Sequence, residues 1–231
     1  MPTSEKVALV TGASRGIGRS ISVRLAQTGY KVALLARDKK GLEETAKQCG
    51  SGRGILLIQC DVSNSKEWKP AIEKVVEKWG GLQVLVNNAG MHESGDADSW
   101  DRTLDVNLRA TMGFTRLALP YLEKGGGGAV VNIASIAGIT GMAGSAAYCA
   151  SKHGVMGFTR ALFEDVRDKN IKVSAICPGF VATDLTKSPK LDSTKMVQPE
   201  DIAEAVLFVV NFPSTGCPTE IVIRPQHSPR K

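Results

Sequence analysis

Short apolar runs alternate with longer segments of helical periodicity along the chain. Most of the runs are apolar at consecutive positions, as in a strand that is covered on both faces. Repeated strand–helix units of this kind build a parallel sheet. We therefore expect an α/β fold of the Rossmann type, a doubly wound parallel sheet of about seven strands with helices on both faces. The expected strands are 6–10, 31–35, 55–59, 83–86, 129–134, 172–176 and 220–223.

The segments between these runs carry apolar residues at helical spacing. The expected helices are 14–28, 39–49, 65–79, 100–122, 146–167 and 200–210. The strand–helix rhythm continues across the glycine run 125–128, so this run is expected to be a loop rather than a linker. We expect a single domain over residues 1–231.

A glycine-rich turn, 11–18, follows the first expected strand and opens the first helix. The start of a helix presents unpaired N–H groups and the positive end of its dipole to an anion. Gly12 permits the tight turn, Gly16 lets the backbone approach a pyrophosphate, and Gly18 lets the helix pack close to the strand. This position predicts dinucleotide binding by Gly12, Ser14, Arg15, Gly16, Ile17 and Gly18.

The end of the second strand distinguishes the two common dinucleotides. In NAD sites an acidic residue about 20 positions past the glycines holds the ribose 2′-hydroxyl. Here Arg37 stands at that strand end, and a guanidinium suits the 2′-phosphate of NADP. Arg15 adds a second cation. We expect NADP; the alternative is NAD, with Asp38 as the ribose acid.

Tyr148 and Lys152 lie four residues apart on an expected helix and therefore on one face. A free phenol has a pKa near 10. The Lys152 ammonium, together with a positive nicotinamide, is expected to lower that pKa and let Tyr148 exchange a proton with a substrate oxygen. Ser135 ends the fifth strand, where its hydroxyl can bind the same oxygen.

Together these motifs resemble the short-chain dehydrogenase/reductase family, in its single-domain main branch, over about residues 5–210. The resemblance rests on 11–18, Asp61-Val62, 87–90, Asn107, Ser135, Tyr148 with Lys152, and Pro178-Gly179.

The resemblance implies an NADP-dependent oxidoreductase that moves a hydride between nicotinamide and a carbonyl or secondary alcohol. It implies that Tyr148 is the acid/base, that Ser135 orients the carbonyl, and that Lys152 also holds the nicotinamide ribose. It implies that Asn107 kinks its helix and holds a water in a proton relay. The implied cofactor contacts are Asp61 and Val62 at the adenine, Asn88, Ala89 and Gly90 along the cleft, and Pro178, Gly179, Val181 and Thr183 beside the carboxamide.

Several expectations are less closely tied to the motifs. A short substrate lid is expected at about 184–198, and a homodimer or homotetramer is implied by the resemblance. Candidates for the substrate side of the cleft are Met91, His92, Glu93, Ile136, Ala137, Met142 and Phe180. Two alternatives stay open, an NAD-dependent alcohol or hydroxy-acid dehydrogenase and a non-catalytic NADP-sensing protein.

Composition limits the remaining classes. Lys and Arg number 29 against 23 Asp and Glu, but this excess is spread out, so we expect no nucleic-acid partner. The five cysteines form no CxxC pair, and the histidines lack metal-ligand spacing, so we expect no metal site. No apolar run reaches the ~18 residues of a membrane span. We expect a small-molecule carbonyl or alcohol substrate, no membrane partner and a cytoplasmic location.

Overall fold

The structure, a computed structural model, describes residues 6–50, 54–93, 95 and 97–230. The ends of the expected domain, residues 1–5 and 231, lie outside the described residues. A parallel sheet of seven strands runs through the centre of the described chain, in the order β3-β2-β1-β4-β5-β6-β7. This arrangement confirms the predicted fold class. The strands are β1 (Val7–Thr11), β2 (Lys31–Ala36), β3 (Ile55–Gln59), β4 (Val84–Asn87), β5 (Gly128–Ile133), β6 (Ile171–Pro178) and β7 (Glu220–Ile223).

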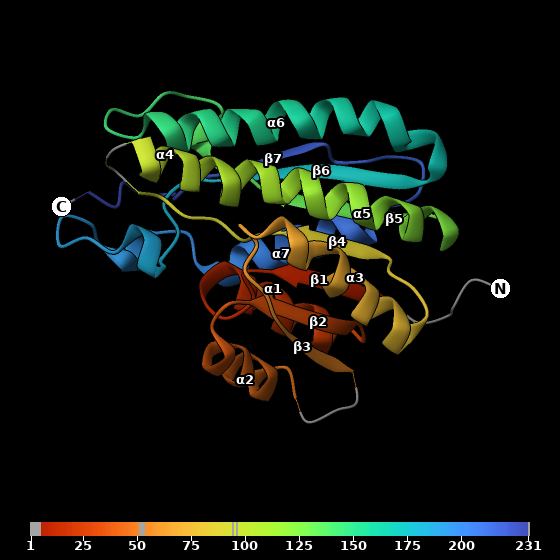
Figure 1. The fold of residues 1–231 in the computed structure, drawn as a ribbon. Coiled ribbons are helices and arrows are strands. Elements are labelled where there is room, and N and C mark those ends of the chain that lie inside the picture. The colour runs from red at the N-terminus through yellow and green to blue at the C-terminus, as the bar shows by residue number, and fades with distance from the viewer. Residues whose placement is uncertain (1–5, 51–53, 94, 96, 231) are drawn as a thin grey trace.

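Helices cover both faces of this sheet (Figure 1). Alternate residues of β1 point to opposite faces, as the pleat requires. The helices are α1 (Gly16–Gln27), α2 (Lys39–Gln48), α3 (Ser65–Trp79), α4 (Ala97–Leu104), α5 (Ala110–Lys124), α6 (Ala146–Val166) and α7 (Pro199–Asn211). Ala8 and Val10 join the core under α1, α2 and α7, whereas Val7 and Leu9 join the core under α3, α5 and α6.

Local capping residues set several of the helix boundaries. The Asp38 carboxylate accepts a hydrogen bond from the Gly41 N–H and so caps α2. Asn64 caps α3 in the same way, and Gly80, with a φ of 78°, ends that helix in the left-handed conformation. Helix α7 begins at Pro199, one residue earlier than predicted, because proline suits the first helical position.

The helix predicted over 100–122 is interrupted. Residues Asp105–Arg109 form a π-helical turn between α4 and α5. A π turn inserts one extra residue and is often found at functional sites. Here the turn directs the Asn107 side chain inward, where it is 1% exposed. The Asn107 carbonyl accepts a hydrogen bond from Thr111 Oγ1 at 2.9 Å.

The segment predicted to be a lid is anchored at both ends. It contains two short 3₁₀ turns, Asp184–Thr186 and Ser193–Lys195. Val181 pairs with Val197 in a parallel bridge at its base. Leu191 pairs with Arg230 in an antiparallel bridge, so the C-terminal tail holds the outer part of this segment. Figure 1 shows the tail and this segment at the same end of the molecule.

Candidate active site

One cavity of about 770 Å³ lies at the carboxyl ends of the central strands. This is where doubly wound sheets bind ligands, beside the point at which the strand order reverses, here between β1 and β4. Every residue predicted for cofactor or catalysis lines this cavity except Asn107, which lies behind it. The lining includes Gly12, Ser14–Gly18, Arg37, Asp61, Val62, Asn88–Gly90, Ser135, Tyr148, Lys152, Pro178, Gly179, Val181 and Thr183.

The glycine turn has the geometry of an anion site. Gly12 and Gly16 have φ angles of +67° and +53°, a left-handed conformation that favours glycine. A Cβ on Gly18 would overlap the Gly12 carbonyl oxygen, so helix and strand require a glycine there to approach this closely. Arg15 stands at the helix N-cap, and among the described residues no side chain caps α1 and no acid occupies its first turn. The first N–H groups of α1 therefore suit a diphosphate.

The Arg37 end of the cavity bears on the choice between the two dinucleotides. The Arg37 side chain is 75% exposed, and its guanidinium lies 3.7 Å from the Asp61 carboxylate. The Asp38 carboxylate is turned toward α2, where it caps the Gly41 N–H at 3.1 Å. Asp38 is thus engaged in capping α2. The ion pair of the Arg37 side chain with Asp61 is largely exposed, and such a pair stabilises little.

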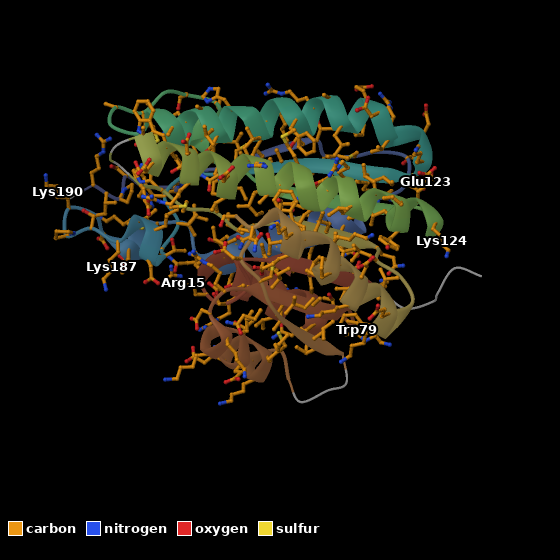
Figure 2. The ribbon with its side chains drawn as sticks, in the orientation of Figure 1. Arg15, Trp79, Glu123, Lys124, Lys187 and Lys190 are labelled. Atoms are coloured by element: carbon orange, nitrogen blue, oxygen red, sulfur yellow. The ribbon has the colours of Figure 1, made fainter. Side chains whose placement is uncertain are left out.

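Arg15 reaches toward the lid rather than toward Arg37. Its guanidinium lies 3.3 Å from the Asp184 carboxylate, with both side chains mostly exposed. Figure 2 shows Arg15 at the same end of the molecule as Lys187 and Lys190, away from Glu123 and Lys124. The ion pair therefore links the glycine turn to the first turn of the lid.

Tyr148, Ser135 and Lys152 come together at the middle of the cavity. The Tyr148 phenol and the Ser135 side chain are close enough to interact. Ser135 is fixed in turn, because its Oγ accepts a hydrogen bond from the Ala137 N–H at 3.1 Å. Lys152 Nζ lies 5.8 Å from the centre of the Tyr148 ring and donates to the Ile133 carbonyl at 2.8 Å. The predicted spacing on one helix face is thus realised in α6.

The charges of this group are set mainly by burial. Burial lowers the pKa of Lys152 to about 8. Burial raises the pKa of Tyr148, and the interaction with Ser135 opposes that rise without cancelling it. In the protein alone, desolvation disfavours the phenolate, and the lowered pKa expected for Tyr148 beside Lys152 and a bound nicotinamide stays a prediction. Tyr148 is held as a neutral phenol, which is a proton donor.

Asn107 does not line the cavity but is hydrogen-bonded to residues close to it. Its Oδ1 accepts from the Met91 N–H at 2.8 Å, and its Nδ2 donates to the Met91 carbonyl at 2.9 Å and to Ser151 Oγ at 3.0 Å. Ser151 Oγ in turn donates to the Tyr148 carbonyl at 2.7 Å. The amide thus fastens the loop after β4 to the helix that carries Tyr148.

Most of the candidates for the substrate side also line the cavity. They are Met91, His92, Ile136, Met142 and Phe180. Glu93 instead pairs with Arg102, and Ala137 is fully buried. Sequence reasoning missed Ala36, Cys60, Val106, Ile133, Ala134 and Ser145 as lining residues, whereas Leu185 and Thr186 belong to the lid predicted at about 184–198. Of the missed residues, Ser145 could have been predicted from the sequence, because it stands almost one helical turn before Tyr148 and therefore close to it.

Two other kinds of site are absent from the described residues. No group of three His, Cys, Asp or Glu side chains in those ranges is arranged to hold a metal ion. No helix formed by the described residues is both long and apolar enough to cross a membrane.

Comparisons with known proteins agree with this geometry. The sequence pattern of the short chain dehydrogenase family matches residues 6–193. Carbonyl reductase family member 4 of Xenopus tropicalis is 38% identical over 220 residues, covering 90% of this chain and 92% of that protein. Human 15-hydroxyprostaglandin dehydrogenase [NAD(+)] is 40% identical over 200 residues, covering 81% and 73% respectively.

A solved structure is similar over nearly the whole chain. A variant of actinorhodin polyketide ketoreductase, crystallised with NADPH, superposes with a TM-score of 0.90 at 32% identity. The match covers 97% of this chain and 98% of the ketoreductase.

Proposed function

The chain belongs to the short chain dehydrogenase family, and from this premise we propose that it is an NADP-dependent carbonyl reductase with Tyr148 as the proton donor. Members of this family are oxidoreductases that use a nicotinamide cofactor and act on carbonyl or alcohol groups. One observation carries the finer proposal. A single cavity joins the Tyr148–Ser135 pair to the glycine turn and to Arg37.

The proposed reaction follows from the charges of the site. Bound reduced nicotinamide supplies the hydride. Tyr148 gives its phenolic proton to the substrate carbonyl oxygen, and the Ser135 hydroxyl donates a second hydrogen bond to that oxygen. The Lys152 ammonium then stabilises the phenolate that Tyr148 becomes. Because burial keeps the phenol protonated beforehand, Tyr148 holds the proton that carbonyl reduction requires.

The remaining cofactor roles are part of the same proposal. The N–H groups at the start of α1 hold the diphosphate, and Lys152 holds the nicotinamide ribose. Asp61 and Val62 contact the adenine, and Asn88–Gly90 line the cleft beside it. The residues proposed to flank the carboxamide are Pro178, Gly179, Val181 and Thr183. Asn107 places the loop and α6 in register for a proton relay through Lys152.

Replacing Tyr148 tests the catalytic part. Tyr148→Phe removes the proton donor and leaves the ring packing, so NADPH-dependent ketone reduction is expected to fall by about 10³-fold or more. NADPH binding, measured by its fluorescence, is expected to stay within about twofold, because the phenolic oxygen is not among the proposed diphosphate or 2′-phosphate contacts. Unchanged turnover in this variant would contradict the proposed mechanism.

The choice of NADP is supported by Arg37 and by the engagement of Asp38 in capping. The likeness to a ketoreductase crystallised with NADPH points the same way. The 40% identity to a dehydrogenase named for NAD(+) favours the alternative, an NAD-dependent enzyme. In Arg37→Asp we expect NADPH affinity to fall at least tenfold and NADH affinity to change much less. Equal affinity for both cofactors in the unaltered protein would refute the preference.

We also propose a homodimer or homotetramer of single-domain chains in the cytoplasm. Trp100, Met112 and Phe208 are large apolar side chains that lie exposed on helices, as at the surface of an assembling protein. Sedimentation velocity tests the assembly, and a monomer at micromolar concentration would contradict it.

A further inference from the structure

Much of the cavity lining next to the catalytic group is apolar. Met91, Ile136 and Met142 line the cavity beside the catalytic group. Two polar side chains, His92 and Ser145, interrupt this apolar lining. A polar pair in an apolar pocket is the kind of feature that fixes a ligand's orientation.

His92 and Ser145 are joined to each other and to the catalytic tyrosine. His92 Nε2 lies 3.0 Å from Ser145 Oγ, within hydrogen-bond distance. The His92 ring meets the Tyr148 ring edge-on, with centroids 4.9 Å apart and an interplanar angle of 74°. Ser145 is 8% exposed and directly precedes α6, the helix that carries Tyr148. The pair is therefore held rigidly beside the proton donor.

The hydrogen-bond donors of His92 and Ser145 can be counted for each neutral form of the His92 ring. If His92 Nε2 carries the proton, it donates to Ser145 Oγ and the serine hydroxyl keeps its own proton to give. If Nε2 accepts instead, the serine proton is used and the proton on Nδ1 remains. No described residue takes a hydrogen bond from Nδ1. Either tautomer thus leaves one donor at the cavity wall for a ligand.

We propose that His92 and Ser145 form a subsite for a second substrate oxygen on a carbon next to the reacting carbonyl. The substrate class is then an apolar dicarbonyl or hydroxy ketone. The proposal rests on the function proposed above, because Tyr148 and Ser135 must hold the reacting oxygen. A simple ketone would bury the remaining donor without a partner. Sites that bind a substrate oxygen reject analogues that lack it.

A matched pair of ligands separates this subsite from mere packing. Benzil is an apolar diketone, and deoxybenzoin has the same frame with one carbonyl replaced by methylene. Their dissociation constants are measured by calorimetry in the presence of NADP⁺, which carries no hydride, so that binding is read without turnover. Benzil is expected to bind at least about tenfold more tightly than deoxybenzoin.

Three variants test whether the tighter binding of benzil depends on His92 and Ser145. His92→Phe keeps an aromatic edge against Tyr148 but loses both ring nitrogens, and Ser145→Ala removes the partner hydroxyl. The preference is expected to fall to about threefold or less in each. Met142→Leu, an apolar change in the same wall, is the control and is expected to keep it.

The outcomes are distinct. Equal binding of the two ligands to the unaltered protein would overturn the proposal, as would a preference that survives in both His92→Phe and Ser145→Ala. Parallel weakening of both ligands in these variants would assign the pair to packing alone and overturn it too. A failure of the proposed function looks different, since the binding preference would persist while NADPH reduced neither ligand.

Discussion

Replacing Lys152 by methionine should make the protein more stable while abolishing its activity. Methionine has the length and flexibility to fill the space of the lysine stem. Lys152 is 5% exposed, and the ammonium has one hydrogen bond to a described residue, the Ile133 carbonyl. Burial lowers its pKa from 10.5 to about 8. At 1.36 kcal/mol for each pKa unit, the buried charge costs about 3 kcal/mol.

The expected gain in the free energy of unfolding is smaller than this cost. Lys152→Met leaves the Ile133 carbonyl without its partner, which costs about 1 kcal/mol. We expect a net gain of about 2 kcal/mol at pH 7. For a chain of this size that raises the melting temperature by about 4–8 °C. Urea unfolding without cofactor measures the gain, and NADPH-dependent reduction measures the lost activity.

The sharper test is how the stability difference between Lys152→Met and the unaltered protein depends on pH. Below pH 8 both the folded and the unfolded wild type hold the Lys152 proton, so the full cost is present. Between pH 8 and 10.5 the folded protein releases the proton while the unfolded chain keeps it, so wild-type stability rises with pH. The advantage of Lys152→Met should therefore shrink by about 3 kcal/mol over this range. A variant less stable at pH 7, with a difference that stays flat up to pH 10.5, would refute the reasoning.

Two further predictions concern the scaffold of the site. Gly18→Ala should destabilise the fold by about 3 kcal/mol, because its Cβ would overlap the Gly12 carbonyl. Gly157→Ala in α6 should stabilise the fold by about 0.5–1 kcal/mol, because a Cβ has open space there. Urea titration compares the two, and similar effects would contradict the packing argument. Asn107→Ala should lower the free energy of unfolding by about 2–4 kcal/mol, because it releases the Met91 backbone. Asn107→Asp should recover only part of this loss. A loss below about 0.5 kcal/mol in Asn107→Ala would show that the amide does not hold the structure together.

The sheet and the cofactor side of the cavity were predictable because local patterns determine them. A strand buried on both faces must be apolar throughout, and a helix that approaches a strand closely needs glycine. Residues such as Gly12 and Gly18 therefore mark the site directly in the sequence. Tyr148 and Lys152 were placed correctly because four residues on a helix define one face.

Features that depend on long-range contacts could not be predicted in the same way. The π turn at Asp105–Arg109 is stabilised by contacts of Asn107 with Met91 and Ser151, which are distant in sequence. The raised pKa of Tyr148 depends on burial, which spacing does not reveal. The partnership of His92 with Ser145 joins two loops that no sequence motif links.

The bridge between Leu191 and Arg230 ties the segment predicted to be a lid to the C-terminal tail, which contains none of the proposed catalytic residues. The Asp192 N–H also donates to the Pro229 carbonyl at 2.8 Å, so two adjacent positions are secured. Trimming or crosslinking around 229–230 should therefore alter how substrates are admitted and how products leave, while the chemical step itself is untouched. An engineer seeking a wider or narrower range of accepted substrates could change residues there without altering the proposed proton donor.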